Sequence, residues 1–162
     1  MQPLESRIVA EMEPDAPPDP PAKSGDAAPL RGVVLYIEDV LVNFALVEAM
    51  LSAHPDLRLI HATTGHEGVR LARTERPDII LLDMHLPDIF GLEVVRLLNE
   101  DIANGDFRVI LLTADSLNID VLKAMSLGAF EYLVKPVDLR ALEASMRRAL
   151  SFKASGGSSA RL

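Results

Sequence analysis

The chain has 162 residues, enough for one domain with a full hydrophobic core and too few for two domains of ordinary size. Its composition, 49% hydrophobic and 25% charged, is that of a globular protein. The formal charge of −8 argues against binding to nucleic acid or to an anionic membrane, because both partners are themselves anionic. The absence of cysteine excludes disulfides and thiol chemistry.

The first thirty residues differ in composition from the rest of the chain. Residues 1–30 hold seven of the eleven prolines, and their six acidic and two basic side chains leave a net charge of −4. Such a sequence buries too little apolar area to offset the entropy of ordering it. We therefore predict a disordered N-terminal arm over residues 1–30, with a short helix around residues 6–12 as its one candidate element. A domain over residues 31–153 and a flexible Gly/Ser tail over residues 154–162 complete the expected organisation.

No stretch of the sequence has the features of a targeting or membrane-spanning segment. The N-terminus lacks a basic region followed by an apolar one, and no apolar run approaches the ~18 residues that suggest a membrane span. The expected location is the cytoplasm.

Strand-like and helix-like runs alternate five times within residues 31–153. The strand-like runs cover residues 33–38, 57–63, 78–83, 107–113 and 130–135. The helix-like runs cover residues 40–53, 65–75, 91–103, 117–127 and 138–152. Gly105 and Gly128 stand where helices end, and Pro77 follows a helix end. Five such units with short links predict an α/β fold, a parallel sheet with helices on both faces.

Acidic residues follow two of the apolar runs. The run at residues 79–82 ends in Asp83, and the run at residues 33–37 leads into Glu38 and Asp39. Continuous apolar runs of this length are typical of parallel strands buried on both faces, and open α/β sheets bind ligands at the carboxyl ends of such strands. Three carboxylates at one sheet edge repel one another, and Mg²⁺, which prefers oxygen ligands, would balance them.

Two further strand ends supply a hydroxyl and an ammonium group. The fourth strand-like run ends at Thr113 and the fifth at Lys135. A lysine is a compact cation that neutralises phosphoryl or carboxylate oxygens. With a divalent ion, these groups suit the attack of a carboxylate on phosphorus, an established route to an aspartyl-phosphate.

Four stretches in this order resemble the receiver domain of response regulators in two-component signalling, the CheY-like superfamily. They are Val34-Leu35-Tyr36-Ile37-Glu38-Asp39, Leu82-Asp83-Met84-His85-Leu86-Pro87-Asp88-Ile89-Phe90-Gly91-Leu92, Leu112-Thr113-Ala114 and Tyr132-Leu133-Val134-Lys135-Pro136. The resemblance implies a doubly wound, flavodoxin-like sheet of five parallel strands in the order 2-1-3-4-5.

The resemblance also implies the phosphoacceptor and the metal ligands. Asp83 matches the phosphoacceptor, and Glu38 and Asp39 match the acidic pair that holds Mg²⁺. The backbone carbonyl of His85 matches a further ligand of the ion.

Three more roles follow from the same motifs. Thr113 matches the switch hydroxyl, and Tyr132 matches the aromatic residue whose rotamer follows it. Lys135 matches the phosphate-binding lysine, and its bond to Pro136 is implied to be cis, against a base rate of ~5% for X–Pro bonds.

Each of these residues taken singly has an ordinary structural explanation. Asp39 precedes a helix and could be its N-cap, and Thr113 could be a strand-end hydroxyl. Lys135 could be a solvated charge, and Tyr132 could simply pack in the core. Their convergence at one sheet edge favours the functional interpretation. The four histidines lack the spacing of metal ligands, so none is expected to bind metal through its ring: His54, His61, His66 and His85.

The helix expected at residues 40–53 is apolar on both sides. Leu46, Val47, Met50 and Leu51 have core spacing, yet the other side carries Leu41, Phe44, Ala45 and Ala49. A surface helix is normally polar toward solvent, so a face with Leu41 and Phe44 exposed would be a docking site. Self-association through the same face, giving a homodimer, is the alternative.

The function predicted from the sequence is a phosphorylatable switch. A histidine kinase or phosphotransfer protein would supply the phosphoryl group to Asp83, and the chain would catalyse only its own phosphorylation and dephosphorylation. About a dozen residues follow the last helix, so the output is an unknown partner protein, or the chain is cut from a longer one such as a hybrid kinase. The alternatives are an interaction module that is not phosphorylated and a small Mg²⁺-dependent phosphohydrolase. A phosphohydrolase of the haloacid-dehalogenase type needs a second acid two residues after its nucleophile, where this chain has His85.

Overall fold

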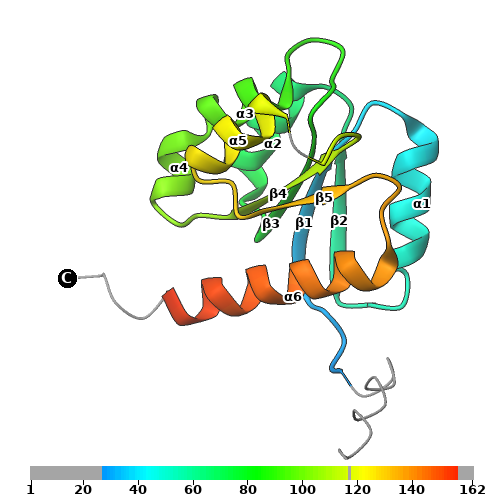
Figure 1. Cartoon of the computed structure of the whole chain (residues 1–162). Coiled ribbons are helices and arrows are strands. Elements are labelled where there is room, and N and C mark those ends of the chain that lie inside the picture. The colour runs from blue at the N-terminus through cyan, green and yellow to red at the C-terminus, as the bar shows by residue number, and fades with distance from the viewer. Residues whose placement is uncertain (1–26, 117, 157–162) are drawn as a thin grey trace, which may run out of the picture.

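A five-stranded parallel sheet forms the centre of the computed structural model, which describes residues 27–116 and 118–156 (Figure 1). The strand order is β2-β1-β3-β4-β5, which confirms the predicted order 2-1-3-4-5. The strands are β1 Gly32–Ile37, β2 Leu57–Ala62, β3 Ile79–Asp83, β4 Arg108–Thr113 and β5 Glu131–Val134. Each observed strand differs from its predicted range by at most one residue at either end.

Helices cover both faces of the sheet (Figure 1). They are α1 Leu41–Leu51, α2 Gly65–Glu75, α3 Gly91–Leu97, α4 Asn99–Ala103, α5 Ile119–Ser126 and α6 Leu139–Gly156. Buried residues of α1 and α6 share one apolar cluster, and those of α2 to α5 share the other. Within the described part of the chain, no helix combines the length and apolarity needed to cross a membrane.

The alternation of side chains along the strands creates the two cores. Leu35 and Ile37 of β1 enter the cluster beneath α2 to α5, whereas Val34 and Tyr36 enter the cluster beneath α1 and α6. All five residues of β3 are buried. Because successive side chains of a strand point to opposite faces, a strand between two helical layers must be apolar throughout, as the sequence pattern indicated.

One expected helix is divided in two. The prediction of a single helix over residues 91–103 is wrong at Leu98, whose φ of −97° and ψ of 8° interrupt the regular helix between α3 and α4. Hydrogen bonds continue across the break, from the Leu98 N–H to Val94 O and from the Ile102 N–H to Leu98 O. All three side chains are buried in the same core, so both short helices keep their apolar side against it despite the break.

The exposed side of α1 differs from the expected one. Phe44, expected to be exposed, is half-buried and stacks on the His61 ring of β2 at 3.8 Å between centroids. Leu46, expected in the core, is 50% exposed. The helix lies over the β1–β2 edge, which turns Phe44 and Val47 toward the sheet. Leu41, 68% exposed, does face solvent as expected.

The end of the predicted N-terminal arm contacts the domain. Leu30 is buried, and its N–H donates to Nδ1 of His54 at 2.9 Å. A guanidinium nitrogen of Arg147 in α6 donates to the carbonyl of Ala28 at 2.6 Å. The predicted flexible tail is wrong at residues 154–156, which continue helix α6. The rest of the predicted arm and tail, residues 1–26 and 157–162, lies outside the described residues.

Close packing of α2 on β1 gives a stability prediction. A Cβ atom at Gly68 would lie 2.7 Å from Cγ1 and 3.1 Å from Cγ2 of the fully buried Ile37. Gly68→Ala should therefore lower the free energy of unfolding by about 1–2 kcal/mol, since overpacking outweighs the gain in helix propensity. Urea denaturation measures the change. The control, Arg70→Ala on the exposed side of α2, should stay within about 0.5 kcal/mol of wild type, and equal stabilities of both variants would contradict the packing argument.

Candidate functional site

The carboxyl ends of four strands bring the predicted polar residues to one sheet edge. Glu38 follows β1, Asp83 ends β3, Thr113 ends β4 and Lys135 follows β5. The parallel register places Asp83 opposite Leu112 and Thr113 opposite Val134, so neighbouring strands end at nearly the same level. Parallel pairing thus gathers residues almost one hundred positions apart in the sequence.

Three carboxylates form a compact group at this edge. One oxygen from each of Glu38, Asp39 and Asp83 lies within 4.8 Å of the others. Glu38 and Asp83 are buried, whereas Asp39 is exposed. Helix α1 begins after Val40 without a side-chain cap, so Asp39 does not serve as the N-cap that the alternative explanation required. An all-oxygen group open on one side fits a hard divalent cation such as Mg²⁺.

Lys135 is the cation that faces this group. Its Nζ lies 3.1 Å from Oε2 of Glu38 and 3.2 Å from Oδ2 of Asp83. The peptide bond between Lys135 and Pro136 is cis, the isomer that the resemblance implied. One ammonium thus contacts both buried carboxylates, which compensates part of the cost of removing them from water.

Two residues to which the sequence analysis assigned no role in the site, Tyr36 and Asn43, fix the Glu38 side chain. The Tyr36 hydroxyl donates to Oε2 at 3.2 Å, and the Asn43 amide donates to Oε1 at 3.0 Å. Burial alone would raise the pKa of Glu38, yet the Asn43 hydrogen bond and the Lys135 ammonium hold it below its ordinary value. Burial also raises the pKa of the Tyr36 phenol, which therefore remains a protonated donor. Spacing gave a hint, because Tyr36 shares a strand face with Glu38 and Asn43 lies in the first turn of the next helix.

Asp83 has the opposite titration behaviour. Burial raises its pKa above the ordinary value and the Glu38 charge adds to the rise, although the His85 N–H and Lys135 work against it. The His85 N–H donates to Oδ1 of Asp83 at 3.1 Å. One carboxylate oxygen is therefore held by backbone and the other by Lys135, which fixes the orientation of the group.

Thr113 and Tyr132 lie on the two strands beyond Asp83. The buried Thr113 hydroxyl donates to the carbonyl of Asp115 at 3.0 Å and accepts the Asp115 N–H at 3.2 Å. Tyr132 is half-buried and packs at the margin of the core beneath α2 to α5. In the described part of the chain, neither hydroxyl is hydrogen-bonded to a carboxylate of the acidic group.

The histidine rings serve other contacts. Nε2 of His61 lies 2.7 Å from the Glu38 backbone carbonyl, and the buried His54 pairs with Glu143 at 2.8 Å. Among residues 27–116 and 118–156, the one group of three or more potential metal-ligating side chains is the acidic group, and it contains no histidine.

Comparison with known proteins identifies similar sequences. The family model described as "Response regulator receiver domain" matches residues 34–147. The chain is 33% identical to the protein PilH of Pseudomonas aeruginosa over 105 residues, 65% of this chain and 86% of PilH. It is 42% identical to the transcriptional regulatory protein AfsQ1 of Streptomyces coelicolor over 93 residues, 57% of this chain but only 40% of AfsQ1. Against a protein-glutamate methylesterase of Myxococcus xanthus it covers 29% of the relative's length, so some relatives are much longer than the matched part.

Solved structures give the same result. The receiver domain of the sensor histidine kinase PA1611 from Pseudomonas aeruginosa, solved with a magnesium ion coordinated in its active-site cleft, superposes with a TM-score of 0.66 at 31% identity. The match covers 75% of this chain and 99% of that one. The signal receiver domain of a modulated diguanylate cyclase from Desulfovibrio desulfuricans superposes with a TM-score of 0.68 at 27% identity, covering 78% and 99%.

The titration of Asp83 gives a prediction about stability. Its raised pKa means that the folded state holds the proton more tightly than the unfolded state, so the ionised form is disfavoured by folding at neutral pH. Without divalent cations, Asp83→Asn should raise the free energy of unfolding at pH 7 by on the order of 1 kcal/mol. The gain should shrink as the pH falls through the native-state pKa, where wild-type Asp83 is protonated. Urea denaturation at pH 7 and at acid pH measures the difference.

The control for this prediction is Asp88, a carboxylate whose ionised form is stabilised by hydrogen bonds in the folded protein. The exposed Asp88 accepts the N–H groups of Gly65 at 2.8 Å and His66 at 2.9 Å, so Asp88→Asn should lower stability at pH 7. If Asp83→Asn instead lowered stability at pH 7, folding would not disfavour the ionised Asp83 carboxylate, and the prediction would be wrong.

Proposed function

Because the chain belongs to the response-regulator receiver family, we propose that it is a phosphorylatable switch in which Asp83 accepts a phosphoryl group. The contact that carries the proposal is the one between Asp83 and Lys135, at 3.2 Å, beside two further carboxylates. This arrangement brings a nucleophile, a cation for phosphoryl oxygens and an all-oxygen metal site together at one edge of the sheet.

The transfer would proceed by attack of an Asp83 carboxylate oxygen on phosphorus. With a phosphohistidine donor, a P–O bond forms, the P–N bond breaks, and the electron pair leaves with the imidazole nitrogen. The His85 N–H and Lys135 hold the attacking carboxylate in one orientation. Lys135 can then follow the negative charge from the carboxylate to the phosphoryl oxygens, a charge-assisted contact of the strong class.

The residues present fit a Mg²⁺ ion. Glu38, Asp39 and Asp83 would hold it together with the backbone carbonyl of His85, and the bound ion would supply positive charge to the phosphoryl oxygens. The magnesium ion in the related PA1611 receiver structure supports this assignment. Tyr36 and Asn43 contribute by orienting Glu38.

Thr113 and Tyr132 are proposed as the switch pair. The Thr113 hydroxyl bonds only to the backbone of its own turn at Asp115, so its present contacts are local and exchangeable. Tyr132 is half-buried on the neighbouring strand β5 and packs at the margin of the core beneath α2 to α5. A phosphoryl group on Asp83 would offer the hydroxyl a charged acceptor, which forms a stronger hydrogen bond than a neutral carbonyl does.

We assign the receiver domain to residues 31–153, between the N-terminal arm and the tail. The proposed location is the cytoplasm. The phosphodonor would be a histidine kinase or phosphotransfer protein, and the output an unidentified partner protein. No catalytic activity is proposed beyond the chain's own phosphorylation and dephosphorylation, and neither nucleic acid nor membrane is proposed as a partner. A phosphohydrolase function has less support, because His85 stands where its second acid would be needed.

An apolar rim beside the acidic group suits the docking of the phosphodonor. Val40, Leu41 and Val42 at the start of α1 are 45%, 68% and 77% exposed, and Phe90 of the loop after β3 is 65% exposed. They belong to segments that adjoin the acidic group: Val40 directly follows Asp39, and Phe90 forms a bridge with His85, two residues after Asp83. An apolar surface next to the site excludes water around a docked donor helix.

Asp83 should form a Mg²⁺-dependent acyl phosphate. Incubation with acetyl phosphate and Mg²⁺ should add about 80 Da (HPO₃) in intact-protein mass spectrometry, because the carboxylate is positioned for attack. The adduct should be absent with EDTA and in Asp83→Asn, and present in the control Asp106→Asn, which changes an exposed acid outside the acidic group. An adduct that persists in Asp83→Asn would refute the assignment.

The apolar rim gives a separate prediction about the protein donor. Val42→Glu should slow phosphotransfer from a cognate histidine kinase or phosphotransfer protein roughly tenfold, since it places a charge in an apolar contact. Labelling by acetyl phosphate should be unchanged, because Val42 projects into solvent. The control is Leu97→Glu, an exposed apolar position on the other face of the sheet. Equal rates for both variants would exclude docking at α1, and size-exclusion chromatography tests self-association through the same face.

A further inference from the structure

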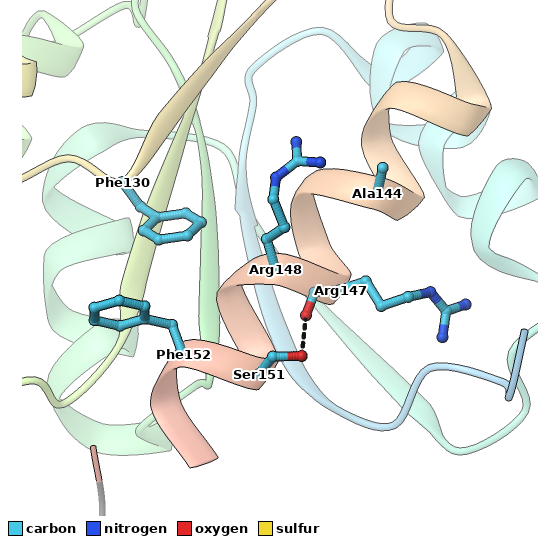
Figure 2. A pocket seen from close by; sticks show the side chains of 6 residues that line it. All are labelled: Phe130, Ala144, Arg147, Arg148, Ser151 and Phe152. Atoms are coloured by element: carbon cyan, nitrogen blue, oxygen red, sulfur yellow. Dashed lines mark hydrogen bonds between the residues drawn. The ribbon is translucent and has the colours of Figure 1, made fainter. Parts of the chain in front are cut away.

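A shallow apolar hollow lies at the sheet edge opposite the acidic group. Its volume is about 670 Å³, and among the described residues its lining consists of Phe130, Ala144, Arg147, Arg148, Ser151 and Phe152. Phe130 immediately precedes β5, and the other residues belong to α6 (Figure 2). We call this hollow the α6 groove.

Two aromatic rings form the apolar part of the α6 groove. Phe130 and Phe152 lie with their ring centroids 6.0 Å apart, and Phe152 is 57% exposed (Figure 2). The guanidinium carbon of Arg108 lies 4.5 Å from the centre of the Phe152 ring. Exposed phenylalanine in contact with an arginine is typical of surfaces that bind a segment with both apolar and acidic side chains.

The charge around the α6 groove is positive. Arg148 forms a two-contact ion pair with Glu131, at 2.6 and 2.8 Å. Arg147 donates to a backbone carbonyl, and Arg108 lies over an aromatic ring. Within the described part of the chain, neither forms an ion pair with a carboxylate. Two guanidinium groups are therefore not ion-paired. Arg108 lies over the Phe152 ring, whereas the Arg147 side chain lines the groove farther along α6 and extends away from both phenylalanine rings (Figure 2).

The chain itself enters the domain beside this groove. The carbonyl that Arg147 binds belongs to Ala28, and the next buried residue, Leu30, is fixed by its hydrogen bond to His54. The root of the N-terminal arm is thus attached to the same helix that lines the groove. Any segment of the arm is held near the α6 groove at a high effective concentration, in the millimolar range for short linkers.

One stretch of the arm matches the groove in chemistry. Residues 4–13 carry apolar side chains four positions apart, and acids around them: Leu4, Ile8 and Met12 with Glu5, Glu11 and Glu13. Apolar residues at this spacing, flanked by acids, suit a basic hydrophobic groove. Residues 14–26 follow as a proline-rich linker of thirteen residues. Fully extended, thirteen residues span about 43 Å, more than the roughly 27 Å length of an 18-residue helix such as α6.

We propose that residues 4–13 dock in the α6 groove of their own chain. Their apolar side chains cover Phe130 and Phe152, and their carboxylates pair with Arg147 and Arg108. Salt weakens the contact, because the opposing charges are screened at high ionic strength. The docked segment covers the edge of the sheet remote from Asp83, so it leaves the phosphoacceptor accessible.

Spin labelling tests the proposal in the full-length chain. The chain has no cysteine, so Ala10→Cys carries a single nitroxide, and ¹⁵N spectra report which amides it broadens. The amides of Phe130, Ser151 and Phe152 should lose more than half their intensity and recover it in 1 M NaCl. The amides of Arg70 and Leu97, on the other face of the sheet, should be unaffected.

Variants on both sides of the contact make the test specific. Glu11→Lys with Glu13→Lys in the arm should remove the broadening, and so should Phe152→Ser in the groove. The control Arg140→Glu, an exposed position in the first turn of α6, should retain it. Phe152→Ser could remove the broadening by disturbing the fold of the domain. The arm variants change residues outside the domain, so they test the contact without that effect.

Two results would overturn the proposal. One is the absence of broadening at the α6 groove, or broadening that the arm variants leave unchanged. The other comes from a mixture of ¹⁵N-labelled chains without a nitroxide and nitroxide-carrying chains without ¹⁵N. If the groove amides broadened in this mixture as much as within one chain, the arm would be docking on a second copy. Neither result bears on phosphorylation of Asp83, which the mass measurement tests alone.

Discussion

The contact of Lys135 with two buried carboxylates is the constraint around which the rest of the structure is arranged. Glu38 and Asp83 lie within 4.8 Å of each other and of Asp39. At an effective dielectric constant near 20, each charged pair at this distance repels by about 3–4 kcal/mol. One ammonium at 3.1 and 3.2 Å offsets part of this repulsion, and the remaining negative charge is what a divalent cation or a raised Asp83 pKa must absorb.

The two hydrophobic cores make this electrostatic cost tolerable. The central strands β1, β3 and β4 are buried on both faces, so their carboxyl ends cannot separate to relieve repulsion without disrupting close packing. The positions of the carboxylates are therefore fixed, and the repulsion can be relieved only by binding a proton or a metal ion. The ionised Asp83 carboxylate is held in an environment that disfavours its charge. The same environment lowers the stability of the folded protein and prepares the carboxylate for reaction with phosphorus.

Local patterns suffice to predict the strands, their order and the residues at their ends, because buried parallel strands require continuous apolar runs and place the next polar residue at the sheet edge. The errors concern features that depend on three-dimensional packing. The break at Leu98 lies between two short helices whose side chains are buried in one core, and no local sequence signal marks it. The exchange of Phe44 and Leu46 reflects a rotation of α1 about its axis, which an almost uniformly apolar helix does not specify. Tyr36 and Asn43 acquire their importance only because the fold brings both to one carboxylate.

Helix α6 connects the acidic group to the α6 groove, and its length decides how the two could influence each other. It begins shortly after Lys135 and extends for 18 residues, roughly 27 Å. The Debye length at physiological ionic strength is about 8 Å, so added charge on Asp83 has almost no direct effect on the arginines of the groove. Buried Leu142, Met146 and Ala149 fix α6 to the core along its length. Any coupling between phosphorylation and the N-terminal arm would therefore require a rigid-body shift of α6, and without such a shift the two sites act independently.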